Sequence, residues 1–214
     1  MKKLLELLYP QVCGICGKKI NERYTCRKCL NILEYYQEMK IASGQSKTYF
    51  DELLCLFPYK GILKSRMLQL KFYGYQYIAK TFGEILAHKM EQKNIKADCI
   101  IPVPISKSRK FERGFNQSEC IAKYMSELTG VPLYRKVLIK TKNNFQQSSL
   151  NLLERANNVK NVYSVQNIDE IKGKTVIVFD DIYTTGATIN ECAKVLKHAG
   201  ASIVIAMTFL YSLK

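Results

Sequence analysis

Apolar residues beyond residue 60 follow two alternating patterns. Four segments have the spacing of helices with one buried face, at 61–72, 76–92, 116–129 and 188–198. Between and around them are short apolar runs typical of buried strands, at Cys99–Val103, Tyr134–Ile139, Val162–Val165, Thr175–Phe179 and Ser202–Leu210. Because strands that alternate with helices form parallel sheets, the pattern predicts an α/β domain with a parallel sheet flanked by helices.

The first 45 residues lack this alternation. Four cysteines occupy a stretch that is poor in periodic apolar residues, and a helix-like segment follows at Asn31–Lys40. The Ser43–Ser46 cluster is typical of a linker, and Tyr49–Pro58 begins with strand-like character. The sequence therefore predicts two domains: a small head with its linker at 1–45 and a larger α/β domain at 46–214.

Length and composition agree with this division. The chain has 214 residues, of which 47% are apolar, enough for one core and a small satellite module. The longest apolar runs have the length of strands, and the opening run Met1–Leu8 contains Glu6. We therefore expect no signal peptide and no transmembrane segment, and a cytoplasmic protein.

The formal net charge is +15. Such a charge favours polyanionic partners, which include nucleic acid, an acidic membrane face and phosphorylated small molecules. No continuous basic block is present, so lysines spread over solvated faces explain the charge equally well.

Two CxxC motifs stand nine residues apart in the head: Cys13 with Cys16, and Cys26 with Cys29. Four cysteines in this arrangement are typical of a tetrahedral zinc site. No ligand position is left for water, so we expect a structural Zn²⁺ ion; iron–sulfur or redox chemistry is the minor alternative. The remaining thiols lie in apolar segments and are expected in the core: Cys55, Cys99, Cys120 and Cys192.

An acidic pair, Asp180 and Asp181, ends the most apolar predicted strand. A hydroxyl- and glycine-rich loop follows, and a helix begins after it; the loop residues are Thr184, Thr185, Gly186, Ala187 and Thr188. Free backbone amides and the positive end of the helix dipole then meet at one place, which suits a phosphate group. The carboxylates suit vicinal hydroxyls and Mg²⁺ beside it. The alternative is an acidic turn with a capped helix and no ligand.

The segment Val176–Thr188 resembles the phosphoribosyl-pyrophosphate signature of type I phosphoribosyltransferases. The resemblance implies that 5-phosphoribosyl 1-pyrophosphate (PRPP) binds with Mg²⁺, which Asp180 and Asp181 hold through the ribose or water. If the chain is an enzyme, pyrophosphate would leave the anomeric carbon while these two carboxylates orient the ribose.

A second block, Ile101–Gln117, leads from a strand end into clustered bases. Arg109 and Arg113 are suited to bind a pyrophosphate bidentately, and Arg109 together with Mg²⁺ would neutralise the leaving group. The block is predicted to contribute Lys107, Arg109, Arg113, Asn116 and Gln117 to the substrate site. In the alternative reading, the arginines are ordinary surface bases at a helix start.

Together with the cysteine head, these blocks resemble the ComF family of competence proteins over nearly the whole chain. The resemblance implies a PRPP-binding protein that supports uptake of single-stranded DNA into the cytoplasm, with a helicase-like ComF partner and DNA-processing proteins at the inner face of the membrane. An active phosphoribosyltransferase with an unidentified acceptor is the alternative, and a structural adaptor is a third possibility.

Weaker matches to the ComF family are Lys71–Gly74 and, in the polar region 141–158 and just beyond it, Gln147–Leu150 with Arg155, Asn158 and Val159. The polar region corresponds to the flexible hood loop of type I enzymes. It offers no evident base-recognising residue, so the acceptor stays open.

Overall fold

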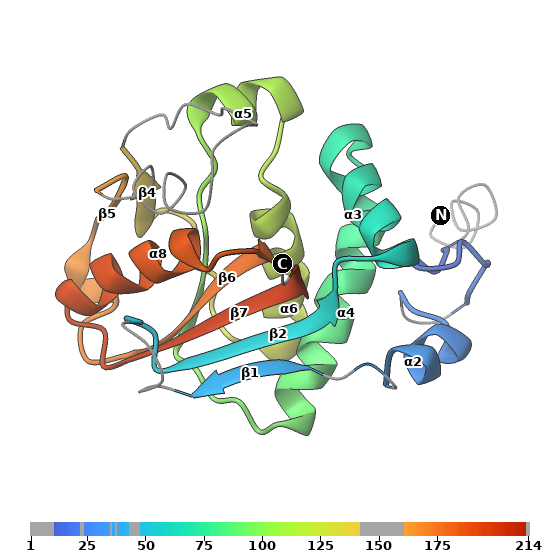
Figure 1. Ribbon diagram of the computed structural model, residues 1–214, viewed down its shortest axis with the longest axis horizontal. Helices are drawn as coiled ribbons and strands as arrows, with labels where there is room; N and C mark the ends of the chain where they lie inside the picture. Colours follow the sequence, from blue (N-terminus) through green and yellow to red (C-terminus); the bar gives the residue numbers. More distant parts are fainter. Residues whose placement is uncertain are drawn as a thin grey trace, which may run out of the picture.

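The computed structural model describes residues 11–21, 24–34, 36, 38–42, 48–141 and 161–212. Its centre is a five-stranded sheet in the order β1-β2-β7-β6-β3 (Figure 1). The strands are β1 (Met39–Ala42), β2 (Glu52–Pro58), β3 (Cys99–Pro102), β6 (Thr175–Tyr183) and β7 (Ile203–Tyr211). All neighbours pair in parallel except β1, which runs antiparallel to β2. The predicted parallel sheet is thus confirmed.

Helices cover both faces of this sheet. One face is packed by α3 (Gly61–Tyr73), α4 (Gln76–Gln92) and α6 (Gln117–Thr129). The other is packed by α8 (Ala187–His198) and by a two-stranded antiparallel sheet of β4 (Leu138–Lys140) and β5 (Tyr163–Val165). Within the described residues, the remaining elements are α2 (Arg27–Glu34), α5 (Lys107–Arg113) and the 3₁₀ turn η1 (Ile168–Glu170).

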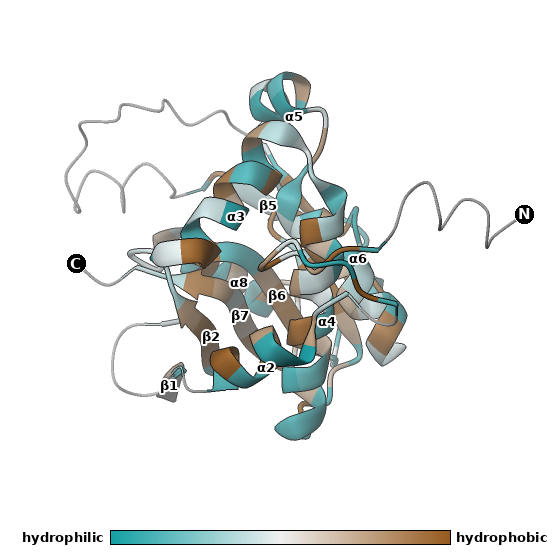
Figure 2. Ribbon diagram, turned by 90° about the vertical axis from the view of Figure 1, so that its right-hand side faces the viewer, coloured by the Kyte–Doolittle hydropathy of each residue, from teal (hydrophilic) through white to brown (hydrophobic). Residues whose placement is uncertain are grey.

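Alternation along the strands divides the core into two layers. In β6, Ile177 and Phe179 face α3, α4 and α6, whereas Val176 and Val178 face α8. The strands are therefore apolar on both sides, and Figure 2 shows them as the hydrophobic centre of the molecule. Cys55, Cys99 and Cys192 are fully buried in the second layer, as expected for small core residues.

Aromatic rings hold the first layer together. Phe82 of α4 stacks on Phe209 of β7 with ring centroids 3.9 Å apart, and Phe57 of β2 meets the same ring edge-on at 5.2 Å. All three side chains are fully buried. Phe209 thus joins two strands and a helix at one contact.

The segment Asn31–Lys40, expected to be a helix, is helical at Asn31–Glu34 but has Met39 and Lys40 in strand β1. Helix α2 starts earlier, at Arg27, where the amides of Cys29 and Leu30 bond back to the Cys26 carbonyl. It ends at Glu34, and β1 then pairs with β2. Pairing with an open sheet edge outweighs the local helix preference here.

Two predicted strands differ from the structure by four residues at one end. The predicted strand Tyr134–Ile139 shrinks to β4, while β6 continues four residues beyond the expected end at Phe179. Because β1 joins the main sheet, the chain before residue 45 contributes a strand to the larger unit. The division into domains 1–45 and 46–214 stays a prediction.

We expect Phe209→Ala to lower the free energy of unfolding by about 3–5 kcal/mol, because it removes the ring shared by β2, β7 and α4. Ile203→Ala, in the same strand but 40% exposed, serves as the control and should cost below about 0.5 kcal/mol. Urea denaturation measures both. Equal losses would contradict the assignment of Phe209 to the centre of the core.

Candidate functional site

The acidic pair lies at the carboxyl end of β6. Pairing with β7 continues through Asp180 opposite Thr208 and Ile182 opposite Leu210, so the acids belong to the strand and do not follow it. Alternation directs Asp181 toward the α3 and α6 side and Asp180 toward the loop before α8. Both carboxylates nevertheless accept a hydrogen bond from the first turn of α6, Asp180 from Ser118 and Asp181 from Gln117.

Asp181 is a buried carboxylate with partners on both oxygens. Gln117 Nε2, in the first turn of α6, donates to Oδ1 at 3.0 Å, and Lys71 Nζ, in the last turn of α3, lies 2.5 Å from Oδ2. The residue is only 4% exposed. Burial alone would raise the pKa of Asp181, but the Lys71 charge and these hydrogen bonds hold the pKa below its usual value. Asp181 is thus a stable anion.

Asp180 is held differently. Its Oδ1 accepts from Ser118 Oγ at 3.0 Å and from the Asp181 amide at 2.9 Å. Burial, and then the neighbouring charge of Asp181, raise the pKa of Asp180 to about 7. A cation or a ring of hydroxyl donors would favour its charged form.

The loop after β6 makes a small recess beside Asp180. Gly186 starts α8 with φ 75°, a left-handed conformation that favours glycine. A Cβ built there would lie 2.7 Å from Tyr183 Cζ, so the backbone can approach closely only without a side chain. A cavity of ≈ 30 Å³ is lined by Asp180, Ile182, Tyr183, Thr184, Gly186, Ala187, Thr188 and Ile189. The predicted loop residues thus meet Asp180, apart from Thr185, whose Oγ1 accepts from the Ala187 amide at 3.3 Å.

Helix α5 carries the predicted bases toward the same edge of the sheet. Ser106 caps it by accepting from the Arg109 amide at 3.3 Å, and Lys107 lies exposed in its first turn. Burial, and then the Arg109 charge, lower the pKa of both Arg113 and Lys140. Arg109 therefore lies among other cations, an arrangement that favours an anion between them.

Arg113 connects this helix to the acid pair. Its Nη1 donates to Gln117 Oε1 at 3.3 Å, and its guanidinium lies over the Phe72 ring at 5.4 Å. Its Nε is buried without a hydrogen-bond partner among the described residues. A buried donor left open beside the site is consistent with a missing anionic ligand.

Asn116 has both polar atoms engaged. Its Oδ1 caps α6 by accepting from the Ser118 amide at 3.1 Å, and its Nδ2 donates to the Val103 carbonyl at 3.0 Å. The side chain thereby fixes α6 to the end of β3. A direct contact of Asn116 with substrate stays a prediction.

Two residues of this cluster were not assigned to the site from sequence. Lys71 appeared only in the weak match Lys71–Gly74, and Ser118 had no signal except its position next to Gln117. The polar segment with Gln147–Leu150, Arg155, Asn158 and Val159 lies outside the described residues.

The four head cysteines converge as predicted. Their sulfur atoms all lie within 4.8 Å of one another, and Cys16 Sγ is 3.7 Å from Cys26 Sγ. Four sulfurs about 2.3 Å from a central zinc ion would be about 3.8 Å apart. The residues therefore fit a structural zinc ion, for which Cys13, Cys16, Cys26 and Cys29 would be the ligands.

The cysteine element is docked on the α3 and α4 helices. Gly14 N–H donates to Thr81 Oγ1 at 2.9 Å, the Tyr24 amide donates to Glu84 Oε2 at 3.0 Å, and Arg66 Nε donates to the Ile15 carbonyl at 2.9 Å. A Cβ on Gly14 would lie only 2.6 Å from Thr81 Oγ1. The head is thus an integral part of the molecule's first core layer.

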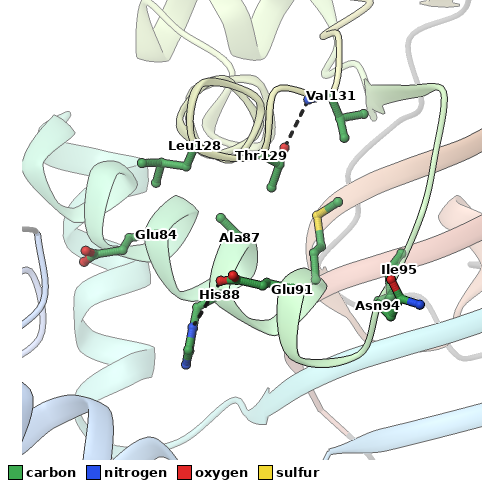
Figure 3. A pocket seen from close by; sticks show the side chains of 10 residues that line it. Glu84, Ala87, His88, Glu91, Asn94, Ile95, Leu128, Thr129 and Val131 are labelled. Atoms are coloured by element: carbon green, nitrogen blue, oxygen red, sulfur yellow. Dashed lines mark hydrogen bonds and ion pairs between the residues drawn. The ribbon is translucent and has the colours of Figure 1, made fainter.

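A larger cavity of ≈ 610 Å³ lies elsewhere, between α4 and α6 (Figure 3). Glu84, His88 and Glu91 face it from α4, and Leu128 and Thr129 face it from α6. Its two carboxylates disfavour a phosphate, and it contains none of the predicted site residues. The acidic pair and the larger cavity are therefore separate features.

Residues 76–214 match the phosphoribosyl transferase domain family. The match includes the parallel strands β3, β6 and β7, the acid pair and the α8 loop. The chain belongs to this family, and its fold is that of the type I phosphoribosyltransferases. The cysteine head and Lys71 lie outside the matched range.

Curated relatives extend the similarity to most of the chain. Competence protein F of Haemophilus influenzae is 26% identical over 88% of this chain and 85% of its own length. Competence protein ComFC of Bacillus subtilis is 26% identical over 97% and 81%, and DNA utilization protein YhgH of Salmonella typhimurium is 24% identical over 94% and 90%. The resemblance to ComF-type proteins is thereby confirmed.

We expect about one zinc ion per chain and its loss in Cys26→Ser, with a lower thermal midpoint because the head packs into the core. Cys120→Ser, a half-buried thiol outside the cluster, should keep the metal. Elemental analysis and thermal denaturation measure both effects. A stable wild-type chain that contains no zinc after purification without chelators would contradict the site.

Proposed function

We propose that the chain binds PRPP with Mg²⁺ at the carboxyl edge of its sheet. The observation that supports this best is the meeting of three features at one place: the acid pair of β6, the glycine loop that opens α8, and the bases of α5. A phosphate, vicinal hydroxyls and a diphosphate require these three kinds of group.

Each group has a defined task in this proposal. The loop from Thr184 to Thr188 binds the 5-phosphate through amides and hydroxyls, and Asp180 and Asp181 accept hydrogen bonds from the ribose hydroxyls. Arg109 and Arg113 bind the diphosphate, with Lys107 and Gln117 beside them. Mg²⁺ would neutralise diphosphate charge, bound through ribose oxygens or water next to the two carboxylates.

The biological role we propose is support of DNA uptake in the cytoplasm, with import of single-stranded DNA. The relatives named as competence and DNA utilization proteins support it. The helicase-like partner and DNA-processing proteins implied by the ComF resemblance would bring the chain to the inner face of the membrane. Among the described residues, no helix is both long and apolar enough to span a bilayer.

A row of aromatic rings beside the site supports contact with single-stranded DNA. Tyr73 and Tyr75 stack at 5.8 Å, and Tyr75 and Tyr77 stack at 5.8 Å. Phe72 is 62%, Tyr73 71% and Tyr75 44% exposed. Exposed rings of this kind stack on unpaired bases with little regard to sequence.

Cations also lie against other aromatic rings. Lys80 lies 5.4 Å from the Tyr24 ring and 5.7 Å from the Tyr124 ring, with Lys123 at 5.5 Å from the latter. Helix α5 presents the exposed Lys107, Lys110 and Phe111. Exposed rings together with cations fit a chain of bases on a phosphate backbone.

An active phosphoribosyltransferase is the second candidate. The cations around Arg109 suit departure of pyrophosphate from the anomeric carbon, with Arg109 stabilising the leaving group and the acid pair orienting the ribose. Turnover requires an acceptor, and the segment predicted to cover it lies outside the described residues. Pyrophosphate release with a nucleobase panel would favour this candidate over a sensing role.

We expect Asp181→Asn to weaken binding of PRPP and Mg²⁺ at least about 30-fold, equivalent to about 2 kcal/mol, because a charged acceptor of the ribose becomes neutral. Glu91→Gln, an exposed carboxylate beside the remote cavity, is the control and should bind as the wild type does. Calorimetric titration measures all three chains. Equal affinities would place PRPP elsewhere, and no binding to folded wild type would reject the proposal.

We expect the double variant Tyr73→Ala/Tyr75→Ala to lose about tenfold or more in affinity for a short single-stranded oligonucleotide, since each stacked base contributes about 1–3 kcal/mol. Tyr49→Ala, which removes a 43% exposed ring near His198, should change little. Fluorescence anisotropy at two salt concentrations measures both. Equal effects of the two changes would argue against a stacking row.

A further inference from the structure

The ion pair between Lys71 and Asp181 conflicts with the ligand role proposed for Asp181. One oxygen accepts from Gln117 at 3.0 Å, and the other lies 2.5 Å from the Lys71 ammonium. The Asp181 side chain is only 6% exposed. Ribose hydroxyls or a hydrated cation therefore reach this carboxylate only if one partner leaves.

Lys71 is the partner that can leave. Its side chain is 17% exposed and has a flexible four-carbon stem. Gln117 is 4% exposed, belongs to the first turn of α6 and is also bonded to Arg113. Moving the lysine requires only rotations of one side chain, whereas moving Gln117 disrupts a packed helix start.

The backbone that carries Lys71 is fixed. Helix α3 ends at Gly74, whose amide bonds to the Leu70 carbonyl at 3.2 Å with φ 67°. Five residues before Lys71, Arg66 of the same helix donates to the Ile15 carbonyl of the cysteine element. The ammonium can thus swing while its attachment point stays in place.

A second anionic destination lies within the same cluster. Arg113 packs over Phe72, the residue next to Lys71, and Arg113 is a proposed ligand of the diphosphate. A diphosphate bound there would bring negative charge close to the freed ammonium. The Lys71 ammonium would then exchange the Asp181 carboxylate for the diphosphate and would not remain unpaired at low dielectric.

We propose that Lys71 is an internal counter-cation that keeps Asp181 closed to free divalent ions and is exchanged for ligand when PRPP arrives together with Mg²⁺. The inference rests on the proposed function, since it concerns the same site. A bare cation offers Lys71 no new anion, whereas the metal–diphosphate complex does. The lysine thereby makes metal binding depend on the diphosphate.

Binding of Mn²⁺ alone tests the exchange, because Mn²⁺ prefers the same oxygen ligands as Mg²⁺. In calorimetric titrations of zinc-loaded protein, Lys71→Met should bind Mn²⁺ about tenfold or more tightly than the wild type. It should at the same time bind PRPP with Mg²⁺ more weakly. Lys71→Arg and the exposed control Lys64→Met on the same helix should bind Mn²⁺ as the wild type does.

Equal Mn²⁺ affinities of Lys71→Met and the wild type would overturn the exchange. The titration with Mn²⁺ alone does not depend on whether PRPP binds. If the wild type fails to bind PRPP but the variant gains Mn²⁺ affinity, the proposed function falls while the closure of Asp181 by Lys71 stands.

Wild-type protein provides a second measurement in case Lys71→Met does not fold. In NMR spectra of protein labelled with ¹³C at lysine Cε, the Lys71 signal is assigned by its loss in Lys71→Arg. We expect that signal to move on addition of PRPP with Mg²⁺ and to stay in place with Mg²⁺ alone. A Lys71 signal unchanged by PRPP, or moved equally by Mg²⁺ alone, overturns the exchange.

Discussion

A charged carboxylate buried at the end of a parallel strand determines how the site is built. An unpaired anion at that depth would cost several kcal/mol, so other elements must bring donors to it. Helix α3 brings Lys71 to Asp181 with its last turn, and α6 brings Gln117 with its first. The orientation of both helices at the sheet edge is therefore linked to one side chain of β6.

The same requirement separates two acids that are adjacent in sequence. Asp181 has an ion pair with Lys71, a hydrogen bond from Gln117 and a lowered pKa, while Asp180, one residue earlier, has neutral donors and a raised pKa. Protein groups thus keep Asp181 charged, whereas an external cation or donor would favour the charged form of Asp180. Two identical residue types acquire different chemistry because Lys71 pairs with one of them, while the other accepts only from neutral donors.

The sequence predicted those features whose signal lies in residues that are close together along the chain. The apolar run of β6, the glycine loop and the two CxxC motifs each contain their own signal, and the structure brings the cysteine set together as expected. Lys71 and Ser118 were missed as site residues because their importance arises from contacts with a distant strand. The helix prediction for Asn31–Lys40 was wrong at its end for a related reason. Met39 and its neighbours pair with the edge of β2, and no local propensity reveals this pairing.

The pairing of β1 with β2 has a consequence for solubility. In the described sheet, β1 is the outermost strand next to β2 and satisfies the backbone groups that β2 would otherwise present to solvent. An open, largely apolar edge is a template for pairing between chains. A shortened chain that begins at β2 would keep the phosphoribosyl transferase domain intact in sequence and yet expose that edge, so self-association would accompany loss of the head.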